Sequence, residues 1–337
     1  MLNKIKNYIK DEWKFLVIIL LIYIVLQIPL NYYITIGGGI SDVSSRIEVE
    51  NANSHKGSFN ISYVEQLPGT VLSYLLSYVI PTWERENADD YKYNVTETIS
   101  DIDFRSELDL RTANGTATYW AYHLANKDVE LINSQLYVIA TFEDYETTLK
   151  VQDEILAIDG NHYQTVKEYK EYMNSIDGNK ITVKVKRKNK EQDIEVPLYE
   201  VEGKKVIGVA LQYVKDYKTN PNLKIKFEKE ESGPSGGLIT TLEIYNQLTK
   251  KDITKGKSIA GTGTIEEDGT IGQIGGIEHK ILGADRANAD LFLVPSGQNY
   301  KDAVKYKKDK NLKIQLIEVK TINDALEKLE ELKWELV

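Results

Sequence analysis

The chain has 337 residues, enough for two soluble domains with cores of their own. Its net charge of −9 argues against a general nucleic-acid-binding protein, because contacts to phosphates need clustered lysine and arginine. It contains no cysteine, which excludes a disulfide framework and any thiolate chemistry.

The first predicted element is an apolar run from Phe15 to Ile36 that carries no charged side chain. At about 1.5 Å per residue, a helix of this length would span about 33 Å, and the hydrocarbon core of a bilayer is about 30 Å thick. Lysines precede the run and the next basic residue is Arg46, so the positive-inside bias places residues 1–14 in the cytoplasm and residues 37–337 outside the cell. A cleaved signal peptide is the alternative, but the run is longer than a typical signal core and no small-residue cleavage site stands near its end.

Residues 37–128 form the next segment. A short apolar run at 71–80 predicts a core helix or strand, strands are expected at 46–50 and 58–64, and a helix is expected over 102–127 with a break near Asn114-Gly115. The two strands lack a full set of partners within the segment. We therefore expect it to complete the fold of the C-terminal segment described below, with a separate unit as the open alternative.

The pattern changes from Leu136 onward. Strands at 136–142 and 153–158, an Asp159-Gly160 turn, a helix at 165–176 and a hairpin at 181–198 follow one another. This order resembles that of bacterial PDZ domains, and residues 149–155 stand where such domains carry Leu-x-x-Gly-Asp-x-Ile, with Gln152 in place of the glycine. The resemblance, assigned to residues 129–200, implies binding of an extended peptide as an added strand, with the grip near Leu136–Ile139.

The last segment, residues 201–337, mixes strands and helices, so the fold class of the chain is α+β (mixed α/β). We expect strands at 205–213, 223–228, 258–265, 270–274, 290–295 and 313–319. Helices are expected from Pro234 onward, at 277–288 and at 322–332.

The stretch Gly233-Pro-Ser235-Gly-Gly opens the first of these helices. Pro234 suits the first turn of a helix, which would put Ser235 at the N-terminus, where unpaired backbone N–H groups favour negative charge. A serine flanked by glycines there suits a nucleophile whose attack creates an oxyanion. Taken alone, the stretch also fits an ordinary helix cap.

A second glycine-opened helix carries Lys280 one turn in, on the side that holds Ile277, Ile281 and Ala284. A lysine acts as a general base only when neutral, and burial beside apolar groups lowers its pKa by up to about 3–5 units in extreme cases. The ordinary alternative is a surface lysine whose aliphatic part covers apolar neighbours. His279 points away around the helix and is expected at the surface.

Four motifs follow one another in this segment: Gly233-Pro-Ser235-Gly-Gly, Ile259-Ala-Gly-Thr262-Gly, Gly275-Gly-Ile-Glu-His-Lys280 and Phe292-Leu-Val-Pro295. Together they resemble the Lon-type serine peptidases, which use a Ser–Lys dyad. The resemblance implies Ser235 as nucleophile, Lys280 as base and Thr262 as a hydroxyl that orients the lysine amine. The backbone N–H groups of Ser235 and Gly236 are the expected oxyanion donors. Two departures are Ser232, where an acidic residue is usual, and Gly236, where alanine is usual.

The order of anchor, PDZ domain and Lon-type peptidase resembles the membrane-anchored PDZ–Lon-like proteases of Gram-positive bacteria. No G-x-x-x-x-G-K-[ST] motif is present, so ATP is not expected as a cofactor. Neither a metal nor another cofactor is predicted. The expected partners are a peptide or protein substrate and the membrane, with no nucleic acid, and a homo-oligomer is left open.

Two other functions remain as alternatives. Gly233-x-Ser235-x-Gly237 also matches the nucleophile elbow of α/β-hydrolase esterases, but that fold needs a late histidine, and His279 is the only one after Ser235. The second alternative is a catalytically inactive surface adaptor that keeps the PDZ domain and the peptidase fold.

Overall fold

A computed structural model describes residues 2–163, 165–226 and 232–332 of the chain. Its contacts divide the chain into two compact units, residues 1–38 with 64–91 and residues 39–63 with 92–337. Residues 227–231 and 333–337 lie outside the described residues, as does the end of the strand predicted at 223–228.

The first unit is built on a three-stranded antiparallel sheet of order β5-β1-β6. Its elements are α1 (Leu2–Leu26), β1 (Pro29–Ile36), β5 (Glu65–Thr70), α2 (Val71–Leu76), β6 (Glu84–Asn87) and the 3-10 helix η1 (Ala88–Tyr91). The helix α2 has no buried residue, so the prediction of a core element at 71–80 is wrong in its burial.

The predicted membrane span over residues 15–36 is wrong as a single helix. The helix α1 ends at Leu26, and Pro29–Ile36 forms the central strand of the three-stranded sheet. Pro29 lacks the N–H that a helix needs, and the β-branched and aromatic residues that follow favour an extended chain. Within the described residues, no helix has both the length and the apolar character that crossing a membrane requires.

The second unit contains a five-stranded sheet of order β19-β18-β15-β4-β2, parallel except for β2. Alternate residues of β18 enter two different apolar clusters, since Leu293 packs with α5 and α8 while Phe292 packs with α6 and α7. Helices therefore cover both faces. The elements are β2 (Ile40–Asp42), β4 (Ser58–Ser62), α5 (Gly237–Leu248), β15 (Ser258–Gly261), α6 (Ile277–Arg286), β18 (Leu291–Pro295), α7 (Gln298–Lys310), β19 (Gln315–Val319) and α8 (Ile322–Glu331).

Strand β4 lies inside this sheet, between β15 and β2, although it comes almost 200 residues earlier in the chain than β15. Segments on both sides of the PDZ-like region therefore build one core. Two short pairs complete it: β3 (Ile47–Val49) with β14 (Leu223–Ile225), and the hairpin of β16 (Thr264–Ile265) and β17 (Ile271–Gly272).

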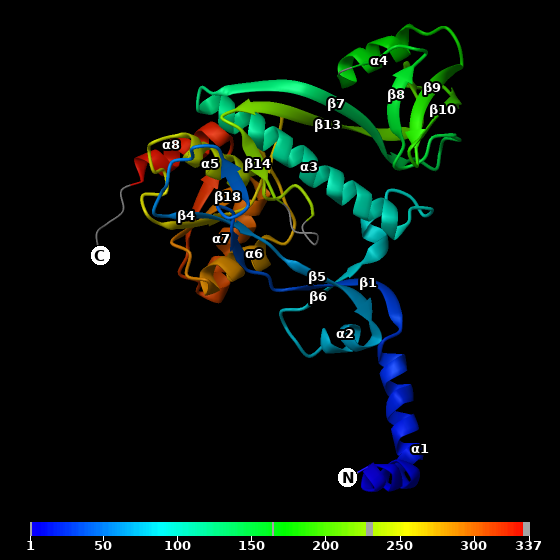
Figure 1. The fold of residues 1–337 in the computed structure, drawn as a ribbon, viewed down its shortest axis with the longest axis vertical. Coiled ribbons are helices and arrows are strands. Elements are labelled where there is room, and N and C mark those ends of the chain that lie inside the picture. Colours follow the sequence, from blue (N-terminus) through cyan, green and yellow to red (C-terminus); the bar gives the residue numbers. More distant parts are fainter. Residues whose placement is uncertain (1, 164, 227–231, 333–337) are drawn as a thin grey trace. The chain divides into compact units, whose positions relative to one another are not determined.

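The PDZ-like region is a second five-stranded sheet, of order β10-β9-β8-β7-β13, with its own apolar cluster. Strand β7 pairs along its whole length with β13, which makes a long ribbon that runs beside α3 (Figure 1). The elements are α3 (Ile99–Leu124), β7 (Asp128–Thr141), β8 (Glu154–Ile158), α4 (Val166–Ser175), β9 (Lys180–Arg187), β10 (Lys190–Pro197), β11 (Tyr199–Val201), β12 (Lys204–Val206) and β13 (Val209–Asn220).

The helix α3 is continuous, so the predicted break near Asn114-Gly115 is wrong. The side chain of Asn114 donates to the carbonyl of Leu110 within the helix instead of ending it. Gly115 is required by packing, because a Cβ there would lie 2.7 Å from the carbonyl oxygen of Lys215 on β13. The two residues that signalled a turn in the sequence thus serve a close helix–strand contact.

Candidate active site

Ser235 lies in a turn directly before α5, which begins at Gly237 with Gly236 as its N-cap. The prediction that Pro234 opens the helix is therefore off by one turn. The carbonyl of Ser235 accepts from Gly263 N–H at 2.8 Å and from Thr262 Oγ1 at 3.1 Å. The end of β15 thus holds the serine turn in place.

Lys280 reaches this turn from α6. Its Nζ lies 3.0 Å from Ser235 Oγ and 3.1 Å from Thr262 Oγ1, so the structure brings together all three side chains singled out in the sequence. Ile277, Ile281 and Ala284 of the same helix belong to a buried apolar cluster. The apolar flank expected around the lysine is therefore present.

Burial shapes the electrostatics of this site. Lys280 is 4% exposed and Thr262 is fully buried, whereas Ser235 is half-buried. Loss of solvation lowers the pKa of the Lys280 ammonium from 10.5 to about 8. At pH 7 about a tenth of the lysine is then neutral, compared with about one part in three thousand at the usual pKa.

Several contacts around the site gave no signal in the sequence. Ser62, on β4, donates from Oγ to the carbonyl of Lys280 at 3.1 Å. Its neighbour Ile61 fills the space where a side chain on Gly236 would go, since a Cβ there would lie 2.8 Å from Ile61 Cδ1. Only the pairing of β4 with β15 brings these residues beside the serine turn.

His279 corrects another expectation. It is 5% exposed, so it is buried rather than at the surface. It lies on α6, whose buried residues pack against the parallel sheet from one side, so even the residue next to Lys280 is enclosed.

The predicted peptide grip at Leu136–Ile139 is also wrong, because this stretch of β7 is paired on both sides. Leu136 and Tyr137 pair with β8, and the main chain of Val138 bonds to the turn before β8. On its other side, β7 pairs with β13. The sheet has two free edges instead, at β10 and at β13, and residues of β13 pack in the same cluster as Tyr169 and Met173 of α4.

Gly208, with φ of +70°, turns the chain into β13, and a Cβ there would lie 2.5 Å from Tyr145 Cβ. The preceding strand β12 is fixed to the end of α4, because Lys205 N–H donates to Asn174 Oδ1. A glycine turn, a free strand edge and a neighbouring helix therefore lie together at this end of the PDZ-like sheet.

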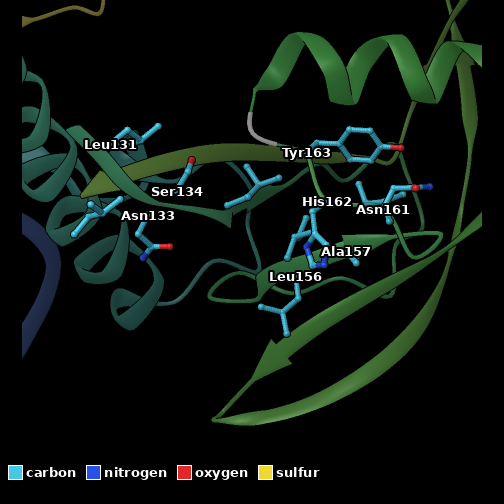
Figure 2. A pocket seen from close by; sticks show the side chains of 12 residues that line it. Leu131, Asn133, Ser134, Leu156, Ala157, Asn161, His162 and Tyr163 are labelled. Atoms are coloured by element: carbon cyan, nitrogen blue, oxygen red, sulfur yellow. The ribbon is translucent and has the colours of Figure 1, made fainter. Parts of the chain in front are cut away.

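A pocket of about 320 Å³ lies elsewhere on the PDZ-like region, between the first half of β7 and β8. Leu131 and Ser134 line it from β7, Leu156 from β8, and His162 and Tyr163 from the loop that follows (Figure 2). Ser235, Thr262 and Lys280 do not line this pocket.

Comparisons with known protein families agree with two parts of this architecture. Residues 228–331 match the Lon protease (S16) C-terminal proteolytic domain, and residues 131–198 match the PDZ domain. These matches support a Lon-type proteolytic domain and a PDZ domain within the chain, and with them a serine-type peptidase.

Individual relatives cover the proteolytic part. The Lon protease of Trichlorobacter lovleyi is 34% identical over 96 residues, 28% of this chain and 11% of that protein. The Lon protease of Clostridium acetobutylicum is 33% identical over 97 residues, 29% of this chain and 12% of that protein. The chain thus matches about a tenth of the length of these curated relatives.

Among solved structures, the PDZ domain of an SdrC-like protein from Listeria innocua is 27% identical, covering 23% of this chain and 92% of that chain with a TM-score of 0.22. The corresponding domain from Listeria monocytogenes is 24% identical, covering 24% of this chain and 92% of that chain, also with a TM-score of 0.22.

Proposed function

We propose that the protein is a serine endopeptidase in which Ser235 is the nucleophile and Lys280 the general base. One observation carries the proposal: a buried lysine amine whose pKa is lowered to about 8 lies 3.0 Å from the serine hydroxyl. A base of that pKa is poised for proton transfer near neutral pH.

In the proposed mechanism, neutral Lys280 takes the proton of Ser235 Oγ as that oxygen attacks the scissile carbonyl. The protonated lysine then gives the proton to the leaving amine, which departs and leaves an acyl-enzyme. Water attacks the acyl-enzyme by the same route, with Lys280 again as the base. Thr262 Oγ1, which contacts both Lys280 Nζ and the Ser235 carbonyl, holds the two partners in register.

The oxyanion needs donors near the start of α5. Gly237 N–H already donates to the carbonyl of Pro234, and Pro234 has no N–H to offer. We therefore keep the N–H groups of Ser235 and Gly236 as the proposed donors. Loss of one such donor typically costs about 3–4 kcal/mol in the transition state.

Substrate selection is assigned to the PDZ domain. We place an extended peptide on the free edge of β13, beside α4, with its end held at the Gly208 turn between β12 and β13. Since the sequence carries no phosphate-binding motif for ATP, the proposed enzyme is ATP-independent and cuts peptides or flexible segments that need no unfolding.

We further propose that the catalytic domain works outside the cell, held at the membrane through the N-terminal helix. The support is the lysine bias before Phe15 and the exposure of every apolar side chain from Phe15 to Val25. Protease added to intact protoplasts should digest the catalytic domain, and full protection would contradict this location. A homo-oligomer also stays a proposal, which sedimentation of the purified protein would test.

The enzymatic proposal is tested by a serine-reactive fluorophosphonate probe and by digestion of an unstructured protein such as β-casein. The wild-type protein should be labelled at Ser235 and should cut the substrate, whereas Ser235→Ala should do neither. An unlabelled, inactive but folded wild-type protein would instead support the inactive adaptor.

A further inference from the structure

We propose that α3 is a positioning element of the active site, which fixes the serine turn from two sides and is itself fixed by the PDZ strand β13. The proposal rests on Ser235 being the nucleophile and adds to it a role for residues that do not touch the reacting atoms. The PDZ domain would then set the geometry of the nucleophile in addition to binding substrate.

The first contact of α3 is with the chain just before the nucleophile. Gly233 N–H donates to the carbonyl of Ser106 at 3.1 Å. Gly233 has φ of +80°, a conformation that favours glycine, and it stands two residues before Ser235. The helix therefore fixes the point at which the chain enters the serine turn.

The second contact is with the hairpin of β16 and β17, which follows Thr262. Trp120 Nε1 donates to the carbonyl of Glu266 at 3.3 Å, and the indole ring covers Gly269, where a Cβ would lie 2.8 Å from the ring. The same hairpin packs closely against the start of α5, since a Cβ on Gly237 would lie 2.7 Å from Ile265 Cγ2. Displacement of Trp120 would therefore reach the first residue of α5.

The third contact joins α3 to the PDZ strand. Gln212 Nε2, on β13, donates to Asp109 Oδ1 at 3.1 Å and to Thr112 Oγ1 at 3.0 Å. Gly115 allows the main chain of β13 to approach, because a Cβ there would lie 2.7 Å from the Lys215 carbonyl. Gly115 is nine residues from Ser106, so the two contacts lie on opposite faces of the helix.

Strand β13 also reaches the hairpin directly, through an ion pair between Lys215 and Glu267. The PDZ strand, α3, the hairpin and the serine turn thus form one continuous set of contacts. Misplacement of a catalytic group by about 1 Å can cost up to about a hundredfold in rate, so a small shift of α3 has a measurable effect.

Gly115→Ala is the direct test in the full-length protein. Alanine favours a helix interior over glycine, so α3 itself stays folded. The new methyl group pushes α3 away from β13. We expect kcat for a short unstructured peptide to fall about tenfold with KM nearly unchanged, and the rate of fluorophosphonate labelling of Ser235 to fall in the same proportion.

Glu107→Ala is the matched control, because this exposed residue lies on the same helix and also becomes alanine. It should leave kcat and the labelling rate unchanged. Trp120→Phe removes one hydrogen bond and Gln212→Leu removes two, and neither adds volume, so they test the proposal if Gly115→Ala does not fold. Both should lower the labelling rate, by less than Gly115→Ala does.

Unchanged labelling in the folded variants, with an altered KM for long substrates only, would overturn the positioning role and make the PDZ domain a tether. An unlabelled wild-type protein would instead contradict the proposed function itself. The two failures are therefore distinguishable within one experiment.

Discussion

At the scale of one residue, burial sets the pKa of Lys280 and thereby the pH at which it can act as the proposed base. Loss of solvation lowers its pKa to about 8, and in the proposed mechanism only the neutral amine accepts the proton of Ser235. Activity should therefore rise with pH through about 8 and level off above that value. A pH–rate profile of the purified protein measures this directly.

Lys280→Arg should be nearly inactive at every usable pH, because guanidinium does not give up its proton. Lys280→Ala should fail as well, and adding Ser235→Ala to it should cost little more, since residues that act as a unit are not additive. If Lys280→Arg kept more than a tenth of the wild-type turnover, the lysine would not be the base.

The same burial predicts a cost in stability. At about 1.4 kcal/mol per pKa unit, the change from 10.5 to about 8 corresponds to about 3 kcal/mol. The unfolded chain binds the proton up to pH 10.5, so stability should rise between pH 8 and 10.5. Lys280→Met should thus raise the melting temperature at pH 7 while abolishing activity.

Glu243, one of the buried residues of α5, should make the stability of the fold change with pH in the opposite direction, and at lower pH. Burial, with smaller effects from Asp42 and Asp252 against a hydrogen bond from Gln247, raises its pKa from 4.5 to about 7. The unfolded chain ionises first, so stability should fall as pH rises from 4.5 to 7. Thermal melts of Glu243→Gln should lack this fall. A variant that kept the same slope would show that another group causes it.

Gly236 and Ile61 lie in contact beside Ser235, the proposed nucleophile. A methyl group on residue 236 would lie 2.8 Å from Ile61 Cδ1, and overpacking of this kind costs about 1–3 kcal/mol. We expect Gly236→Ala to lower both stability and activity, and Ile61→Val, which removes Cδ1, to restore them. A double-mutant cycle that gave no coupling would show that the two residues do not share this space.

At the scale of the element, the sequence predicted those features that depend only on residues close together in the chain. The apolar flank of α6 and the motifs around Ser235, Thr262 and Lys280 were readable, because each depends on residues within one turn or strand. The continuity of α3 was not, because Asn114-Gly115 is explained only by a strand about 100 residues later. The lysine-rich α7 was missed altogether, since only Asn299 and Ala303 of it are buried.

The proposed peptide site at the edge of β13 likewise depends on strand pairing that the sequence did not predict, and it yields a prediction. Val138 directs its main-chain groups to the turn before β8, so its partner Leu211 directs its own away from β7, toward the free edge of β13. Leu211→Pro therefore removes an N–H from the free edge without breaking the ladder to β7.

This substitution should weaken binding of an extended peptide, measured by fluorescence anisotropy on the Ser235→Ala background, which prevents cleavage. Leu211→Ala keeps the N–H group and serves as the control. Equal affinities of the two variants would place the peptide somewhere other than the edge of β13.

At the scale of the whole molecule, the chain inserts its PDZ sheet into the peptidase fold through the ribbon of β7 and β13. Leu136 and Tyr213 are paired across this ribbon, so an Asn-Gly turn that replaces residues 136–213 would join Gln135 to Val214 as a tight hairpin. The remaining stub keeps Lys215 beside Gly115 and its ion pair with Glu267. The trimmed protein lacks Gln212 and its two contacts to α3, so the serine turn should be disturbed about as much as in Gln212→Leu and no more.

We expect this protein to cleave a short unstructured peptide within a few-fold of the wild-type rate, and to lose most of its activity on a protein substrate that the PDZ domain recruits. The measurement is kcat/KM on both substrates, with the fluorophosphonate labelling rate as a check on the active site. Equal losses on the two substrates, together with normal labelling, would mean that the PDZ domain does not select the substrate. A loss of labelling would mean that the stub alone does not hold α3, and that the intact PDZ sheet is needed to keep the nucleophile in position.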